Sequence, residues 1–137
     1  MNKSLAIAAL LLVNAVHAAD WTFVRSTTHG TLHVDFSTVR KEGNLSVLSA
    51  LIDYPQPQKM FNDTYKSHTH LVAYDCVKGQ RNMAIQQAKY YEGNMATGRV
   101  IIEDAGNKWI MIDPKGMPEQ VTELQFVCGR LAKGGSK

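Results

Sequence analysis

Apolar and polar residues alternate along much of the chain with the period of two that a β-strand with one buried face produces. Trp21 and Phe23 open this pattern, and Val34 continues it beyond a turn at His29-Gly30. In a later segment, every second residue from His68 to Cys76 falls on the same strand face. The strands expected from this alternation are residues 21–24, 31–36, 45–54 and 68–76.

Breaks in the pattern delimit the remaining elements. Pro55-Gln56-Pro57 is predicted to end the third strand, because proline cannot donate a hydrogen bond to a sheet ladder. The following residues, Lys59–Thr64, are predicted to form a loop. Arg81–Tyr91 has glutamines and a lysine that favour a helix and apolar residues at odd positions that fit a strand, and we favour the strand. The last expected strands are residues 99–103 and 109–112, joined as a hairpin by a turn at Gly106-Asn107.

The end of the chain is predicted to be a helix. Pro118 suits the first helical position, Glu119 and Glu123 lie where a helix N-terminus favours anions, and Arg130 and Lys133 lie where a C-terminus favours cations. A strand through residues 124–128 is the alternative. The apolar residues that would share one face of the helix are Val121, Leu124, Cys128 and Leu131.

The first 18 residues have the organisation of a cleaved signal peptide. Lys3 supplies a positive charge, residues 5–13 form an apolar run, and Val16-His17-Ala18 precedes the expected cut. The apolar run is too short to span a bilayer, so no transmembrane segment is expected. Residues 19–137 are therefore predicted to form one exported domain. No cysteine lies at the end of the apolar run, where a lipid anchor would be attached, so no lipid anchor is expected.

Cys76 and Cys128 are the two cysteines of the chain. In an oxidising compartment, two thiols of a small domain are expected to form one disulfide. A redox-active or metal-binding pair is the alternative, but such pairs are usually close in sequence, as in Cys-x-x-Cys. We therefore expect a structural bridge.

Amino-acid composition and net charge indicate a globular domain and argue against a nucleic-acid-binding protein. The charged fraction is 20%, the hydrophobic fraction is 45% and the net charge is +3, values typical of a globular domain. The basic excess is small compared with that of a dedicated nucleic-acid-binding protein, so no nucleic-acid partner is expected. Oligomeric state is not determined by the sequence, and a homodimer is kept open.

Histidines are the best candidates for a small site. His68 and His70 would project from one strand face, where they could bind zinc or copper if a third ligand such as Asp63 or Asp75 approached. The alternative is that both histidines are exposed polar surface. His29 with Ser26 and Asp35 has the composition of a catalytic triad, but no nucleophile-elbow glycine pattern supports it. No enzymatic activity and no cofactor are expected.

Basic and aromatic residues gather in the middle of the chain and are candidates for a partner-binding surface, with a solvated face as the alternative. Lysines also protect sheet edges from unwanted pairing. Trp21 and Trp109 are expected to be core anchors. The basic candidates are Lys59, Lys66, Lys78, Arg81 and Lys89, and the aromatic ones are Tyr54, Phe61, Tyr65, Tyr90 and Tyr91.

The order of short motifs resembles a known family. A signal peptide is followed by Trp21, Val34-Asp35, Asp53-Tyr54 before a proline loop, and Tyr74-Asp75-Cys76. The series ends with Trp109–Pro114 and Val127-Cys128, and as a whole it resembles the surface-adhesin protein E family, small exported proteins of Gram-negative bacteria. The resemblance implies an α+β fold, an antiparallel sheet of about six strands with a C-terminal helix, and a disulfide between the two cysteines.

The resemblance also implies a function class. It predicts an exported, non-enzymatic, adhesin-like protein that binds host extracellular-matrix or plasma proteins. The founding adhesin is held on the outer membrane as a lipoprotein, whereas this chain has no lipid-acceptor cysteine after its signal peptide. The expected location is therefore the periplasm or the medium into which the protein is secreted, with surface display as the alternative. The alternative function is a periplasmic metal- or small-ligand-binding protein that uses His68 and His70.

Overall fold

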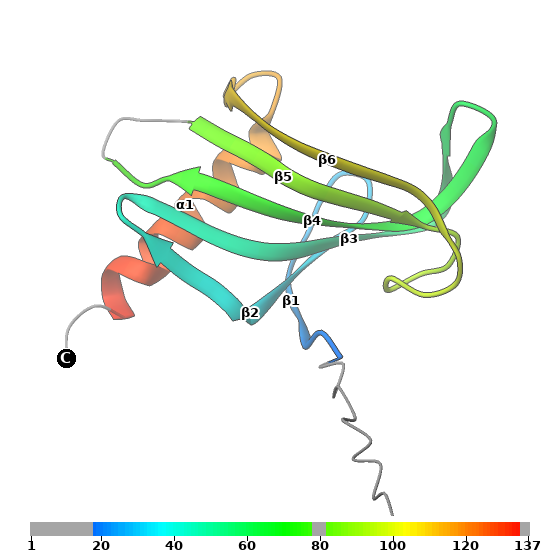
Figure 1. Cartoon of the computed structure of the whole chain (residues 1–137), viewed down its shortest axis with the longest axis horizontal. Coiled ribbons are helices and arrows are strands. Elements are labelled where there is room, and N and C mark those ends of the chain that lie inside the picture. The colour runs from blue at the N-terminus through cyan, green and yellow to red at the C-terminus, as the bar shows by residue number, and fades with distance from the viewer. Residues whose placement is uncertain (1–17, 78–81, 135–137) are drawn as a thin grey trace, which may run out of the picture.

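The structure is a computed structural model that describes residues 18–77 and 82–134. Within them, six strands form one antiparallel sheet in which the spatial order follows the sequence, and a helix lies at the C-terminal end (Figure 1). No described helix has the length and apolar character needed to cross a bilayer. The elements are β1 (Trp21–Ser26), β2 (Thr31–Glu42), β3 (Leu45–Met60), β4 (Asp63–Asp75), β5 (Asn82–Tyr91), β6 (Val100–Met111) and α1 (Pro118–Gly134).

The predicted fold class is confirmed. The ambiguous segment before Tyr91 is a strand, and the C-terminal segment is a helix rather than a strand. Alternation sets two faces of the sheet: residues such as Val72 and Tyr74 of β4 point toward α1, and their neighbours Leu71 and Ala73 point away. We name these the covered face and the open face.

The proline segment does not end β3, so the predicted loop at Lys59–Thr64 is wrong. The strand continues to Met60 and turns at Phe61 into β4. Pairing between β3 and β4 is interrupted between Asp53 and Gln58, which is where both prolines lie. The prolines therefore occupy the one stretch of β3 that does not need to donate ladder hydrogen bonds to β4.

The predicted turn at Gly106-Asn107 is also wrong, because β6 is a single strand. Ala105 pairs with Gln87 and Lys108 with Ile85, so two residues of β6 lie opposite one residue of β5. That arrangement is a β-bulge, which bends a strand without ending it. A Gly-Asn pair in a sequence does not distinguish a bulge from a turn.

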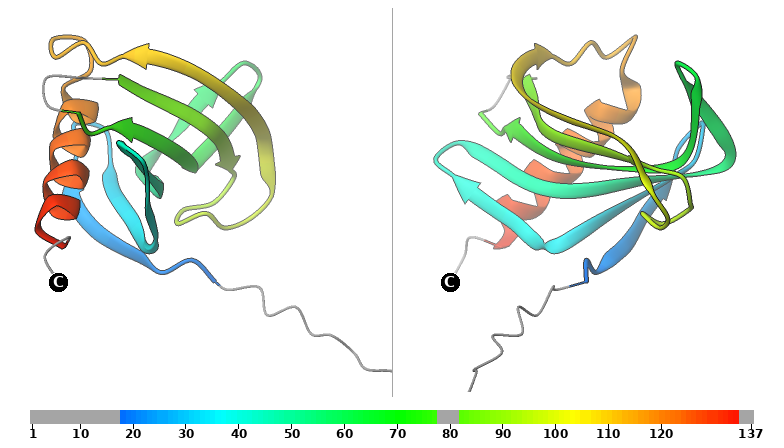
Figure 2. Two further views of the ribbon diagram at one scale, coloured as in Figure 1. Left: turned by 60° about the vertical axis from the view of Figure 1, so that its left-hand side comes forward. Right: turned by 45° about the vertical axis from the view of Figure 1, so that its right-hand side comes forward.

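The core lies between the sheet and α1. Leu124 and Val127 of the helix are buried against apolar residues of β2, β3, β4 and β5. Trp109 is 43% exposed and Trp21 is half-buried, so the tryptophans are not the expected core anchors. Figures 1 and 2 show α1 crossing one end of a curved sheet, while the hairpin between β3 and β4 extends beyond the opposite end.

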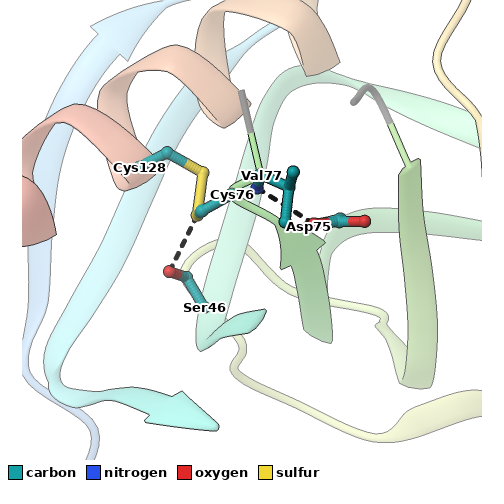
Figure 3. Close-up of a disulfide and its surroundings, with 5 residues drawn as sticks. All are labelled: Ser46, Asp75, Cys76, Val77 and Cys128. Atoms are coloured by element: carbon teal, nitrogen blue, oxygen red, sulfur yellow. Dashed lines mark hydrogen bonds between the residues drawn. A yellow bond between two sulfur atoms is a disulfide. The ribbon is translucent and has the colours of Figure 1, made fainter. Parts of the chain in front are cut away.

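The disulfide between Cys76 and Cys128 is present, as predicted. It joins the residue after β4 to the middle of α1, with the two Cα atoms 5.4 Å apart (Figure 3). The Ser46 hydroxyl donates to the Cys76 sulfur over 3.0 Å, because a bridged sulfur carries no proton. The bridge thus fixes the helix to the end of β4, an inner strand of the sheet. The side chain of Leu131 lies outside the described part of the chain.

Candidate functional site

His68 and His70 lie on the covered face, not on exposed surface. Their ring centroids are 5.4 Å apart, which confirms that the two side chains share a face of β4. The His68 ring is stacked between Tyr54 and Tyr90, at 5.8 and 5.2 Å, and its Nδ1 lies 3.2 Å from the Tyr54 hydroxyl. Tyr65 packs edge-on against Tyr54 and Tyr90. The predicted aromatic candidates Tyr54, Tyr65 and Tyr90 therefore form an internal cluster around a histidine.

Glu123 of α1 meets this cluster from the helix side. Its side chain is buried, with the residue only 6% exposed, and its Oε1 lies 3.6 Å from His70 Nε2. The Tyr74 phenol neighbours the same carboxylate, and both groups line one cavity. No described residue makes a hydrogen bond to Glu123 Oε1. A small cavity of about 190 Å³ adjoins these groups and is lined by both histidines, Tyr54, Tyr74, Tyr90 and Glu123.

Burial controls the protonation of the cluster. It lowers the pKa of His68 from 6.5 to about 3, with a smaller contribution from His70, because an imidazolium ion cannot be solvated there. Burial also raises the pKa of the Tyr74 phenol well above 10, and the neighbouring Glu123 carboxylate raises it further. His68 is therefore neutral at physiological pH, which is the form that can ligate a metal.

The third ligands suggested by the sequence do not approach the histidines. Asp63 starts β4 at the tip of a hairpin, and Asp75 ends the same strand, where its carboxylate accepts a hydrogen bond from Val77. Within the described residues, no group of three or more His, Cys, Asp or Glu side chains is arranged to hold a metal ion. The acidic neighbour of the pair is Glu123. The sequence pattern places Glu123 near a helix N-terminus, and the structure adds that it shares a helical face with Leu124 and Val127.

The structure disperses the predicted basic patch. Lys59 is exposed on the hairpin between β3 and β4, and Lys66 is half-buried on β4 near the base of that hairpin. Lys89 lies on β5 and forms an ion pair with Glu103 over 3.3 Å. Lys78 and Arg81 lie outside the described residues. The three described lysines thus do not form one surface, and partner binding through all five stays a prediction.

The tip of the same hairpin carries an exposed aromatic side chain. Phe61 is 92% exposed and has a φ of 55°, a left-handed conformation that is uncommon for a bulky residue. Met60 pairs with Asp63 around it, and Tyr65 connects the hairpin to the internal aromatic cluster. The hairpin therefore presents an apolar ring to solvent from a base held by ring packing.

The triad composition has no structural counterpart. Ser26 pairs with Thr31 at one end of β1, whereas Asp35 pairs with Trp21 at the other. The Asp35 carboxylate accepts hydrogen bonds from the backbone and hydroxyl of Ser37. His29 is exposed in the turn between β1 and β2. These residues are not brought together.

A family model for surface-adhesin protein E matches residues 21–129, which is most of the chain. The chain belongs to the surface-adhesin protein E family. This membership confirms the predicted resemblance and assigns the chain to a family described as surface adhesins. No curated protein matches the sequence.

Solved structures show the same fold. One crystal form of Haemophilus influenzae protein E aligns with a TM-score of 0.57 and 10% identity, covering 82% of this chain and 93% of that one. Another structure of H. influenzae protein E aligns with a TM-score of 0.55 and 11% identity, covering 87% of this chain and 94% of that one. At such low identity the likeness concerns the fold and does not extend to binding residues.

Proposed function

We propose that the protein is an exported, non-enzymatic, adhesin-like binding protein that contacts host extracellular-matrix or plasma proteins. The observation that carries this proposal is the family match across residues 21–129. The signal peptide, residues 1–18, would direct export and then be removed, which would leave residues 19–137 as one domain. The disulfide suits an oxidising compartment outside the cytoplasm.

We place the partner contact on the hairpin between β3 and β4. Phe61 supplies an exposed ring of the kind that anchors protein interfaces, and Lys59 and Lys66 supply charge near it. Charged residues at a rim mainly accelerate encounter, whereas a buried aromatic ring supplies affinity. Salt should therefore weaken the contribution of the lysines more than that of Phe61.

The test compares variants of the exported chain on a panel of extracellular-matrix and plasma proteins. Phe61→Ser should weaken binding by about tenfold or more, the scale of an interface anchor. Lys59→Glu with Lys66→Glu should weaken binding at low salt. Met111→Ser is the matched control, because Met111 is 78% exposed on β6. Equal binding by Phe61→Ser and the control would place the interface elsewhere.

A second function is favoured by the cavity beside His68 and His70. We propose as the alternative that a periplasmic form binds a small ligand in this cavity, with zinc and copper as the ions to test. The buried Glu123 Oε1, 3.6 Å from His70 Nε2 and without a hydrogen-bond partner among the described residues, supports a ligand there, whereas no three described side chains are already arranged as a metal site. A ligand that binds the native state raises its thermal stability. Saturating zinc or copper should raise the melting temperature of the wild type and of His29→Ala, but not of His70→Ala. An unchanged wild-type melting temperature would reject the site.

A further inference from the structure

The open face of the sheet carries a cleft of about 760 Å³, within the size range of small-molecule binding sites. The register of the strands explains its floor. Trp21 pairs with Asp35, Asp35 with Ser49, Ser49 with Leu71, and Leu71 with Gln87. Five strands therefore each contribute one residue to a single row that crosses the sheet, and all five residues line the cleft: Trp21, Asp35, Ser49, Leu71 and Gln87.

A break in strand pairing shapes one wall of the cleft. Between Asp35 and Arg40, β2 loses its register with β3. Asp35 Oδ1 accepts hydrogen bonds from the backbone and the hydroxyl of Ser37, at 3.0 and 2.6 Å. The Thr38 hydroxyl donates to the Asp35 carbonyl at 2.7 Å and accepts from the Ser49 backbone N–H at 2.9 Å. Such irregularities often re-aim side chains beside binding sites, and here they fix polar groups in place.

The opposite wall is equally ordered. Gln87, Lys89 and Tyr91 alternate along β5, and all three line the cleft. Glu103 of β6 accepts a hydrogen bond from Gln87 Nε2 at 3.0 Å and forms an ion pair with Lys89 at 3.3 Å. The amide and the ammonium group are therefore positioned before any ligand arrives, and the positive charge of Lys89 is already balanced.

The loop after β5 closes one end of the cleft. Asp53 accepts a hydrogen bond from the Met95 backbone at 2.6 Å, and Ser67 accepts one from the Ala96 backbone at 2.9 Å. Met95 and Ala96 are thereby held at the cleft. Ala18 and Ala19 also line it, and the predicted cleavage would remove Ala18 without touching the strand residues of the floor.

From this arrangement we propose that the cleft binds a short uncharged oligosaccharide. Trp21 and Tyr91 line the cleft, and an aromatic ring is a surface on which the C–H side of a pyranose ring can pack. The hydroxyl, amide and carboxylate groups between them can exchange hydrogen bonds with sugar hydroxyls, which both donate and accept. A lipid acyl chain would leave the polar groups of the cleft floor without hydrogen-bond partners. An anionic ligand would face the Asp35 carboxylate, and the Lys89 ammonium group is already paired with Glu103. The remaining cation at the cleft would be the α-ammonium group of Ala19 after the predicted cleavage, at the end of the floor.

This site goes beyond the proposed adhesin function, because it lies on the open face and not on the hairpin that carries Phe61. The experiments on the saccharide site and on the protein-binding hairpin can therefore give opposite results, so failure of one proposal does not imply failure of the other. The two share no lining residue.

The experiment titrates the mature chain with chitotriose, maltotriose, cellotriose and mannotriose. Trp109→Phe is the background, because Trp109 does not line the cleft and its replacement leaves Trp21 as the one fluorescent indole. At least one trisaccharide should shift Trp21 emission in a saturable way. Sialyllactose and a heparin tetrasaccharide are the charged comparators and should bind more weakly.

Two substitutions locate the binding. Gln87→Ala should weaken it by about tenfold, because it removes hydrogen bonds from a preorganised site. Trp21→Ala should weaken it at least as much, measured by calorimetry because the reporter is lost. Near-UV circular dichroism checks that both variants remain folded. The proposal is overturned if no uncharged trisaccharide binds, if Gln87→Ala binds as tightly as its background, or if only the charged comparators bind.

Discussion

The covered and open faces of the sheet come from the same strands but differ in what lies against them. On the covered face, Val72 and Tyr74 are fully buried in the core that α1 closes, and the polar groups there include histidine, tyrosine and glutamate side chains packed against one another. On the open face, the central row contains Ser49, Leu71 and Gln87, and a cleft remains above them. Alternate residues of one period-two sequence therefore build a core under the helix on one side and the floor of a cleft on the other, and the open-face residues Val47, Leu51 and Ala73 beside that floor are themselves fully buried.

The largest expected effect concerns the attachment of the helix to the covered face. Replacing Cys76 and Cys128 by serine should lower the free energy of unfolding by about 2 to 5 kcal/mol, because the bridge closes a loop of 52 residues in the unfolded chain. Chemical denaturation of the exported variant measures this value. A loss below about 1 kcal/mol would mean that packing alone holds α1 to the sheet.

The second effect is a pH dependence located on the covered face. His68 has its pKa lowered from 6.5 to about 3 in the folded protein. Between these values the unfolded chain binds more protons than the folded one, so the free energy of unfolding falls as pH falls. The slope attributable to one group is at most about 1.4 kcal/mol per pH unit.

Denaturation curves from pH 7 to pH 4 test this effect. His68→Gln should flatten the slope, since glutamine does not titrate and can still hydrogen-bond Tyr54. His29→Ala is the control, because His29 is exposed in a turn. An undiminished slope in His68→Gln would assign the acid sensitivity to other groups.

The smallest expected effect on stability is at the far end of the sheet. Phe61→Ser should change the free energy of unfolding by no more than about 0.5 kcal/mol, because an exposed tip residue loses little packing. The same substitution is expected to weaken partner binding, so the hairpin should separate binding from stability. A large destabilisation would show that Phe61 supports the fold.

Much of the fold could be predicted because alternation is a local property. The four early strands, the strand before Tyr91, the C-terminal helix and the disulfide all follow from residues close in sequence or from the pairing of two cysteines. The errors arose where a local signal has two structural meanings. Pro55 and Pro57 interrupt pairing without ending β3, and Gly106-Asn107 forms a bulge and not a turn.

The candidate site was less predictable because it depends on packing between distant elements. Alternation placed His68 and His70 on one face but could not say that α1 covers that face. Glu123 reaches the two histidines only because α1 packs on the covered face. The sequence feature that could have indicated this is an acidic residue next to Leu124 on an otherwise apolar helix face. The row from Trp21 to Gln87 requires the register of five strands, which no local pattern specifies.

Two adjacent residues of β4 test the difference between the faces most directly. Val72 is buried on the covered face, and Leu71 lies half-buried at the floor of the cleft. Val72→Ala should lower the free energy of unfolding by about 2 kcal/mol, whereas Leu71→Ala should lower it by less than about 1 kcal/mol. Urea denaturation of the two variants, side by side, gives the comparison. Equal losses, or a larger loss for Leu71→Ala, would contradict the division of the sheet into a stabilising face and an accessible one.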